Sequence, residues 1–350
     1  MALLLEKQDI QALVQQVGLD SLISDVIDCL AADFGRWQDF DKTPRVAHHY
    51  PHGVIELMPV SDPHQYSFKY VTGHPKNPHD GRLTVAAFGA LAETGSGYPL
   101  LISEMTLLTA IRTAATSVFA AQLLARPESR TMALIGTGCQ AEFQAHAFHS
   151  SFGITDIRYF DVDPTAMAKF ARNLGRHPLR LHACAGVDDA CDGADIISTV
   201  TADKANRTVV SRKHLRPGVH FNGVGGDCPG KTELAPDMLA DLKIAVEYEP
   251  QSRIEGEIQA LDEDSAVTEL WQVLAGDRLV RTSPDDMTLF DSVGFALEDY
   301  SVLRCVYDLC RKHALGRESD LIFTPEDPKD LYSELALPLS ARQVPEAVGS

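Results

Sequence analysis

The sequence predicts an α/β protein with a doubly wound parallel sheet and a second, mostly β domain. Two observations carry this prediction. From residue 131 to about residue 291, short apolar runs alternate with helical stretches, as in a parallel sheet covered by helices. From about residue 44 to residue 104, short runs rich in β-branched and aromatic residues follow one another, with Gly, Pro, Asn or His at the breaks.

The first half of the chain begins with a helical region and continues with strands. Ile10–Phe40 has apolar residues near helical spacing and predicts a helix. Met105–Arg126, rich in Ala and Thr, predicts a long helix that links the β region to the alternating region. Between them, five runs predict strands: RVAHHY (45–50), GVIELMPV (53–60), YSFKYVTG (66–73), RLTVAAFGAL (82–91) and YPLLISEM (98–105).

A glycine turn stands at the start of the alternating region. Gly136, Gly138 and Ala141 follow the apolar run Met132–Ile135 in the spacing G-x-G-x-x-A. The first glycine permits a tight turn, the second lets the backbone approach a pyrophosphate, and the small third residue lets the helix pack on the strand. Asp161 ends the next apolar run, where an acid suits a ribose 2′-hydroxyl and repels a 2′-phosphate. The stretch predicts a site for NAD over NADP; the alternative is an ordinary strand–turn–helix.

The remaining elements continue the alternation. Gly294–His313 predicts a further helix, and Asp320–Phe323 predicts a last short strand. Strands are also predicted near Arg180–Cys184, Ile196–Val200, His220–Val224, Ile244–Val246 and Met287–Phe290.

Composition excludes several classes of partner. The formal charge of −18 argues against nucleic-acid and anionic-membrane binding. No apolar stretch approaches the length of about 18 residues expected of a membrane span. The seven cysteines are scattered and form no C-x-x-C pair, which favours reduced thiols in a cytoplasmic protein without a zinc site.

Four charged residues interrupt apolar runs in the first half of the chain. Arg45, Glu56 and Lys69 lie in or beside predicted strands, and Arg112 lies in the linking helix. Buried charges are costly unless they are paired. They predict a pocket, with cations for a substrate carboxylate and Glu56 for an ammonium group. The alternatives are solvent-facing edge charges and purely structural ion pairs.

The stretch FNGVGGDCPGKTEL (221–234) carries a second candidate feature. Gly225–Thr232 matches the phosphate loop G-x-x-x-x-G-K-[ST], and Asp291 could serve as its magnesium partner. However, Asp227 would repel phosphate and Pro229 removes a donor. A loop at the carboxyl end of a strand, with Asp227 as an acid/base group, fits better. The alternative is a purely structural role, in which Asp227 caps the turn.

Long strings closely resemble the ornithine cyclodeaminase/μ-crystallin family, from roughly residue 30 to residue 330. The resemblance implies a discontinuous first domain for substrate and dimerisation, residues 1–113 completed by 315–350, and an NAD-binding Rossmann domain over 114–314. It also implies a homodimer formed through the β-rich region. The strings are VIELMPV, FKYVTGHP, SEMTLLTAIRTAATS, ALIGTGCQAEFQ, TVTADK, GVGGDCPGKTEL, YEPQSRIEGEIQ and FDSVGFALEDY.

The resemblance also implies the roles of single residues. Asp227 takes the acid/base position, with catalytic parts for Lys69 and Glu56. The implied substrate contacts are Arg45, Met58, Lys69, Arg112 and Val293. The implied cofactor contacts are Thr84, Arg112, Gly136, Gly138, Cys139, Gln140, Asp161, Thr201, Phe221, Asn222, Gly223, Val224, Lys231 and Ser292, and no metal is implied.

The activity that the resemblance implies is the conversion of L-ornithine to L-proline and ammonia. Bound NAD would take a hydride from the substrate and return it after cyclisation, so the cofactor is not consumed. Three alternatives stay open: the same reaction on lysine, net reduction or oxidation of an imino or amino acid by a related enzyme, and a catalytically idle ligand-binding protein.

Overall fold

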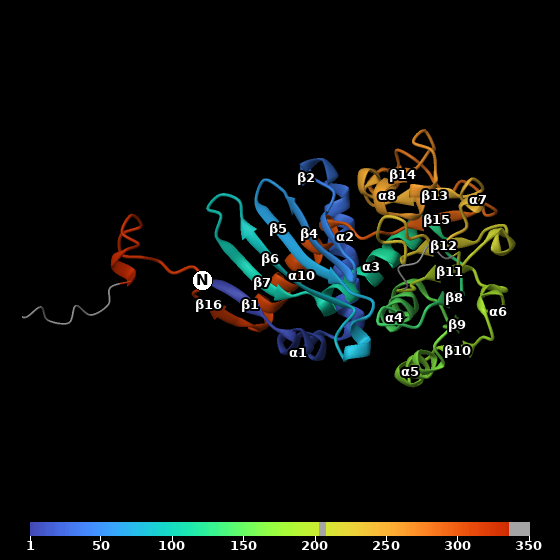
Figure 1. Ribbon diagram of the computed structural model, residues 1–350, viewed down its shortest axis with the longest axis horizontal. Helices are drawn as coiled ribbons and strands as arrows, with labels where there is room; N and C mark the ends of the chain where they lie inside the picture. Colours follow the sequence, from blue (N-terminus) through green and yellow to red (C-terminus); the bar gives the residue numbers. More distant parts are fainter. Residues whose placement is uncertain (203–207, 336–350) are drawn as a thin grey trace, which may run out of the picture.

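The computed structural model describes residues 1–202 and 208–335, and these form two eight-stranded sheets with helices between them (Figure 1). The first sheet belongs to the β-rich part of the chain and the second to the alternating part. Both predicted sheets are therefore present, and the α/β fold class is confirmed.

The first sheet runs in the order β16-β1-β7-β6-β5-β4-β2, with β3 paired to β4. All five predicted runs are strands. The predicted strand Asp320–Phe323 is wrong, because the last strand, β16, lies at Arg317–Ser319 and pairs with β1 at the chain start. Because β16 (RES) contains no apolar residue, its sequence does not predict a strand, and it is recognised only by its pairing with β1. The other bounds are β1 Ala2–Leu5, β2 Asp41–Lys42, β3 Val46–Tyr50, β4 Gly53–Ser61, β5 Gln65–Gly73, β6 Val85–Glu93 and β7 Pro99–Glu104.

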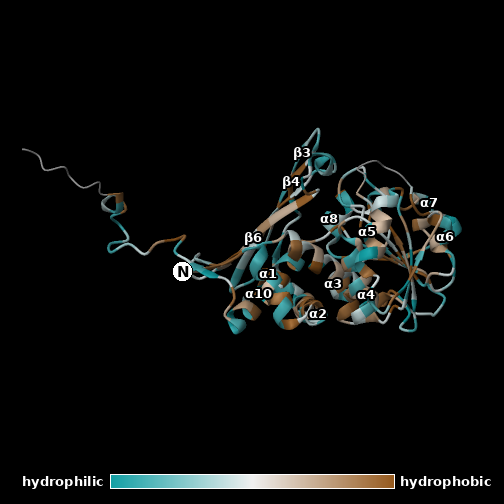
Figure 2. Cartoon of the chain, turned by 90° about the horizontal axis from the view of Figure 1, so that it is seen from below, coloured by the Kyte–Doolittle hydropathy of each residue, from teal (hydrophilic) through white to brown (hydrophobic). Residues whose placement is uncertain are grey.

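Helices cover one face of the first sheet (Figure 2). The helical region predicted over Ile10–Phe40 consists of α1 (Lys7–Val17), α2 (Leu19–Gly35) and a short 3₁₀ turn. Gly18, at φ 85°, separates the two helices because this backbone conformation cannot continue an α-helix. The third helix, α10 (Ala296–His313), packs on β4, β5 and β6 of the first sheet, although the predicted division assigns it to the NAD domain. The division at residues 113/114 and 314/315 stays a prediction.

The second sheet is parallel, in the order β10-β9-β8-β11-β12-β15-β13-β14. The chain moves from β8 outward to β10 and then returns to β11 on the other side of β8. Ligands of such sheets bind outside the carboxyl ends of the strands where the order reverses. The bounds are β8 Thr131–Ile135, β9 Asp156–Phe160, β10 Arg180–Ala183, β11 Ile196–Thr199, β12 His220–Gly223, β13 Lys243–Val246, β14 Thr268–Glu269 and β15 Thr288–Asp291.

Helices between these strands lie on both faces of the second sheet (Figure 1). The helix predicted to follow the glycine turn is α4, and α8 lies within the string YEPQSRIEGEIQ. Their bounds are α4 Ala141–Phe152, α5 Pro164–Leu174, α6 Val187–Cys191, α7 Pro236–Leu239, α8 Glu249–Glu255 and α9 Leu270–Leu274.

The linking helix α3 (Thr106–Leu124) lies between the two sheets and contacts α2, α4, α10 and strands of both sheets. By length and composition it could cross a membrane, contrary to the expectation that no apolar stretch reaches such a length. Its most apolar window is, however, 83% buried inside the protein, as expected of a core helix. Its apolar surface therefore joins the two halves of the molecule.

Candidate active site

The glycine turn after β8 has the geometry that its spacing predicts. Gly136 has φ 99°, and a Cβ there would lie 2.9 Å from the carbonyl oxygen of Val200. At Gly138 a Cβ would meet nothing within 4 Å, so the space in front of the turn is open. Ala141, fully buried, begins α4 and lets that helix pack closely. The turn therefore fits a dinucleotide pyrophosphate at the sheet's reversal point.

Asp161 lies beside this turn, directly after β9. Its Oδ2 accepts hydrogen bonds from the backbone N–H of Thr137 at 2.6 Å and from the Thr137 hydroxyl at 3.1 Å. Its Oδ1 accepts a hydrogen bond from the N–H of Asp163 at 2.9 Å. The carboxylate is thus fixed at the position where a ribose hydroxyl is expected.

Arg45 is the centre of the first group of buried charges. Its Nη1 donates to Glu56 on β4 at 3.1 Å, and its Nε lies 2.9 Å from Oε2 of Glu255 at the end of α8. Its Nη2 donates to the carbonyl oxygens of Val293 and Gly294, which follow β15. Arg45 therefore ties the first sheet to two loops at the carboxyl edge of the second.

Lys69 and Arg112 form the second group, with acids from α10. The Lys69 ammonium lies 2.8 Å from Asp299, and Arg112 contacts Asp299 at 3.0 Å and Glu298 at 2.5 Å. Burial, followed by the charge of Arg112, lowers the pKa of Lys69 to about 8. The side chains of the predicted pocket charges are buried and ion-paired, so they are not solvent-facing edge charges.

Asp227 lies in the loop after β12, and its side chain is 50% exposed. The nearly buried Lys231 bonds to Asp227 at 3.1 Å and to the carbonyl oxygen of Thr201 at 3.1 Å. Burial lowers the pKa of Arg45, but the charges of Glu56 and Glu255, and to a smaller extent that of Asp227, raise it above its usual value. Since Lys231 is turned to these partners, the literal phosphate-loop match does not form a phosphate cradle.

Three buried carboxylates hold this loop in place. Each accepts hydrogen bonds from backbone N–H groups of another segment. Asp291 accepts from the N–H groups of 257 and 258 at 2.9 and 3.0 Å. Glu257 accepts from the N–H groups of 233 and 234 at 2.8 and 3.0 Å. Glu233 accepts from Thr201 at 2.9 Å and from Gly225 at 3.0 Å. We call Glu233, Glu257 and Asp291 the carboxylate ladder. Asp291 is therefore a loop anchor rather than a magnesium ligand.

The remaining predicted residues fall into two sets. Some lie beside the charge groups or at the carboxyl edge of the second sheet: Met58 on β4 is buried and pairs with Lys69, Thr201 follows β11, and Ser292 and Val293 follow β15. Others have different surroundings. Thr84 accepts a hydrogen bond from His74, Cys139 is exposed at the turn, and Gln140 precedes α4. Phe221, Asn222 and Gly223 are buried within β12, and Val224 follows them.

Sequence reasoning missed the acids that pair with the predicted cations. Glu255, Glu298 and Asp299 are buried beside Arg45, Lys69 and Arg112. An available signal was their place in the unusual strings YEPQSRIEGEIQ and FDSVGFALEDY. Buried Glu247 was also missed; it accepts a hydrogen bond from Ser292 at 2.8 Å and from Gly294 at 3.1 Å.

Comparison with known proteins agrees with this geometry. Residues 7–314 match the family model of the ornithine cyclodeaminase/mu-crystallin family. The chain belongs to this family. An ornithine cyclodeaminase of Brucella suis biovar 1 is 54% identical over 323 residues, which cover 92% of this chain and 90% of that protein.

Two solved structures of related proteins share the fold along almost the whole chain. A lysine cyclodeaminase, studied for its recognition of L-lysine, L-ornithine and L-2,4-diaminobutyric acid, has a TM-score of 0.89 at 30% identity and covers 95% of this chain and 98% of its own. An archaeal alanine dehydrogenase dimer with bound NAD has a TM-score of 0.83 at 27% identity and covers 91% and 99%. The family fold thus serves both cyclising deaminases and dehydrogenases.

Proposed function

We propose that this protein is an NAD-dependent ornithine cyclodeaminase that converts L-ornithine to L-proline and ammonia. The observation that carries the proposal is the placement of Arg45. It is paired with Glu56 and Glu255 and bonded to the carbonyl oxygens of Val293 and Gly294, at the carboxyl edge of the second sheet from which the dinucleotide turn and the loop of Asp227 also extend. The 54% identity to an ornithine cyclodeaminase supports it. The reaction would connect ornithine breakdown to proline formation, and the scattered cysteines support a cytoplasmic location.

The residues at the reversal point fit NAD. The open space before Gly138 suits the pyrophosphate, and Asp161 suits the ribose hydroxyls. Thr201, Lys231 and Ser292 are proposed as further contacts, because they lie on the loops that follow β11, β12 and β15. When bound, NAD would supply reversible hydride acceptance at the substrate α-carbon.

The chain's own residues would bind and orient the substrate. Arg45, Lys69 and Arg112 are proposed to hold the carboxylate, since they are the buried cations of the two charge groups. Asp227 would take a proton from the δ-ammonium group, because only a neutral amine can attack the α-carbon. Holding both ends of one substrate makes this attack intramolecular, which replaces a bimolecular encounter.

Ornithine is favoured over lysine by similarity alone. The chain is 54% identical to an ornithine cyclodeaminase and 30% identical to the lysine cyclodeaminase of known structure. One methylene in a pocket changes binding by only about 1–3 kcal/mol, so both substrates need to be tested.

The deciding experiment incubates the purified protein with catalytic NAD⁺ and either L-ornithine or L-lysine. Ammonia and proline without net NADH would support the proposal, and pipecolate from lysine as the better substrate would point to a lysine cyclodeaminase. Stoichiometric NADH would show a net dehydrogenase, and no product would show a ligand-binding protein.

We further propose a homodimer that covers the open face of the first sheet, where no helix of the described residues lies (Figure 2). Register places apolar side chains in a row across β3, β4, β5 and β6 on this face: Val46, Leu57, Tyr70 and Phe88. The segment after β16 extends away from the rest of the protein and exposes apolar side chains (Figure 1), and we propose that these contact the second copy. These are Leu321, Ile322, Phe323, Leu331, Tyr332 and Leu335.

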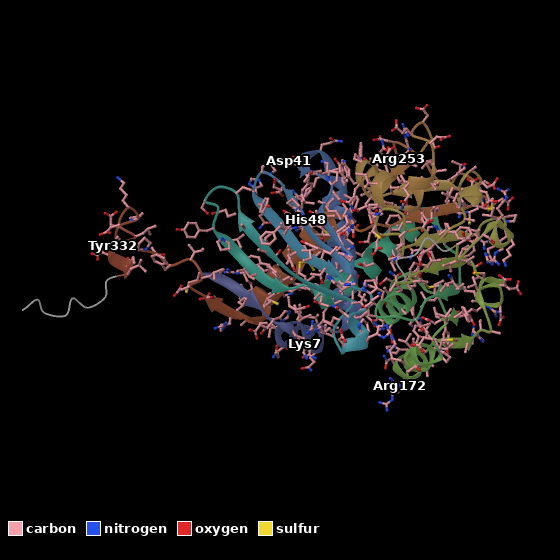
Figure 3. The ribbon with its side chains drawn as sticks, in the orientation of Figure 1. Lys7, Asp41, His48, Arg172, Arg253 and Tyr332 are labelled. Atoms are coloured by element: carbon pink, nitrogen blue, oxygen red, sulfur yellow. The ribbon has the colours of Figure 1, made fainter. Side chains whose placement is uncertain are left out.

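Leu57→Glu tests this interface, because Leu57 is 45% exposed at its centre. We expect the wild-type protein to sediment as a dimer and Leu57→Glu as a monomer, since a buried unpaired carboxylate would oppose association. Arg172→Glu on the exposed surface of α5, in the other half of the molecule (Figure 3), controls for the added negative charge. A monomeric wild-type protein would contradict the proposal.

A further inference from the structure

The proposed reaction needs two proton acceptors, and this inference rests on that proposed function. Ornithine carries an α-ammonium and a δ-ammonium group at neutral pH. The α-nitrogen must lose a proton before a hydride can leave its carbon, and the δ-nitrogen must lose one before it can attack. A single carboxylate holds one proton, so Asp227 alone does not suffice.

Glu255 has the position of a second acceptor. It is the last residue of α8, which lies next to the first sheet at the boundary between the two halves of the molecule (Figure 1). It is 3% exposed, and its Oε2 lies 2.9 Å from Nε of Arg45. Arg253, on the same helix, turns instead to Glu249 and to the carbonyl oxygens of Asp262 and Ser265.

The contact between Glu255 and Arg45 leaves the carboxylate incompletely satisfied. Despite the short distance, neither Nε of Arg45 nor Oε2 of Glu255 completes a hydrogen bond, so the N–H is not directed at the oxygen. Arg45 directs its other N–H groups to Glu56 and to the carbonyl oxygens after β15. Glu255 is therefore a buried carboxylate whose Oε2 lies beside a guanidinium without accepting a hydrogen bond from it.

The charge balance around Glu255 also favours proton uptake. One guanidinium is shared by Glu56 and Glu255, which leaves one negative charge uncompensated in a buried site. Burial raises the pKa of Glu255 to about 7; Arg45 opposes this, while the charges of Glu56 and Asp227 add to it. A group with this pKa can both accept and return a proton near neutral pH.

The carboxylate ladder fixes where Glu255 lies. The next residue, Gly256, packs so closely on Asp291 that a Cβ there would lie 2.4 Å from Oδ2. The following residue, Glu257, is itself a member of the ladder. The backbone next to Glu255 is thus held through the N–H groups of residues 257 and 258, which donate to Asp291, and through the close packing of Gly256. This keeps the carboxylate of Glu255 in the charge group.

We propose that Glu255 accepts the α-ammonium proton of ornithine and returns it to the departing ammonia. In the first transfer an N–H bond of the substrate breaks and an O–H bond forms on Glu255. In the second, that O–H bond breaks and the proton returns to the same nitrogen, whose bond to the α-carbon then breaks. The ring nitrogen, which has released its extra proton to water, forms the C=N bond of the cyclic imine at that carbon. The hydride electrons are those that NAD takes and gives back, so no further oxidant or reductant is needed.

Glu255→Gln tests the proposal, because it keeps the shape and leaves Arg45 paired with Glu56. We expect turnover to fall by about 10²–10³-fold near neutral pH. Activity should partly recover at about pH 9.5, where solvent deprotonates the α-ammonium group. NAD binding, followed by fluorescence titration, should be unchanged.

A single-turnover comparison separates the two acceptors. With Asp227→Asn we expect the reduced nicotinamide absorbance to appear without proline, since only the δ-amine stays protonated. With Glu255→Gln neither should appear. Glu255→Asp, which keeps a carboxylate, should retain the wild-type dependence on pH at a lower rate.

Asp195→Asn is the matched control, because Asp195 accepts two backbone hydrogen bonds at 2.8 and 3.0 Å at the opposite edge of the second sheet. Near-normal turnover of Glu255→Gln would overturn the inference, as would an equal loss at every pH with a lowered melting temperature. A wild-type protein that makes no proline would instead overturn the proposed function.

Discussion

At the scale of single residues, Asp227 combines exposure with a fixed partner. Its side chain is half-exposed, so substrate can reach it, while Lys231 holds one oxygen at 3.1 Å. A general base needs both access and a defined direction. The alternative, a turn cap, requires neither an exposed carboxylate nor a buried cation as its partner, and Asp227 has both.

Asp227→Asn should lower turnover by about 10²–10⁴-fold, the usual contribution of a general base. NAD affinity should stay close to that of the wild-type protein, because the amide oxygen can still accept from Lys231. Steady-state proline formation and an NAD titration measure the two quantities. Near-normal proline formation would show that another group takes the δ-ammonium proton.

Asp161→Ser should weaken the preference for NAD over NADP, because it removes the charge that would repel a 2′-phosphate. We expect the ratio of dissociation constants for the two cofactors to shift toward NADP by about tenfold. Asp163→Ser is the control, since Asp163 only caps α5 through the N–H of Thr165 at 2.8 Å. An unchanged ratio in Asp161→Ser would exclude Asp161 as the ribose contact.

At the scale of elements, the carboxylate ladder explains why the loop after β12 is rich in glycine. A Cβ on Gly225 would lie 2.2 Å from the carboxylate of Glu233, and one on Gly226 would lie 2.6 Å from Oε1 of Glu257. Neither glycine is needed for a left-handed turn, since neither has a positive φ. They are needed because the backbone packs directly on buried acids.

Gly225→Ala should therefore displace the loop that carries Asp227. Overpacking of this kind costs about 1–3 kcal/mol of stability, and a misplacement of about 1 Å can reduce the rate by about 10²-fold. Gly186→Ala is the control, because a Cβ at Gly186 would meet nothing within 4 Å. Thermal unfolding and turnover are measured together. If Gly225→Ala matches Gly186→Ala in both, the ladder does not position Asp227.

At the scale of the whole molecule, acidic residues outnumber basic ones, and many of the buried charged residues are acids. The formal charge is −18, and several buried carboxylates lie at the carboxyl edge of the second sheet. Burial raises the pKa of Asp291 to about 7 and that of Glu257 to about 8, and the charge of Asp291 adds to the shift at Glu257. With Glu255, also near 7, the folded protein retains protons that the unfolded chain releases.

Stability should therefore fall as pH rises from about 5 to 8.5. The folded pKa values lie above those of the unfolded chain, so the folded state binds more protons in this range and loses this advantage as pH passes 7 to 8. Each group contributes on the order of a few kcal/mol. Melting temperatures across this range measure the trend, and Glu255→Gln should make the decline smaller. A melting temperature that rises with pH would contradict it.

Much of the fold follows from local sequence. The strands around Glu56 and Lys69, the glycine turn and the helix after Met105 have patterns that depend only on neighbouring residues. The strand β16 and the break at Gly18 were missed, because β16 is defined by its pairing with β1 and the break by a single backbone angle. The cations of the candidate pocket were predicted because charges within apolar runs are conspicuous.

The sequence by itself determined the two kinds of sheet, the glycine turn with Asp161 and the cations of the candidate site. Only the tertiary structure decided which acids face those cations, because Lys69 and Asp299 lie 230 positions apart. It also raised the pKa of Glu255, since a carboxylate's pKa depends on burial and on charges brought to it by other elements. Local pattern specifies elements, whereas charge pairing and desolvation depend on how those elements pack.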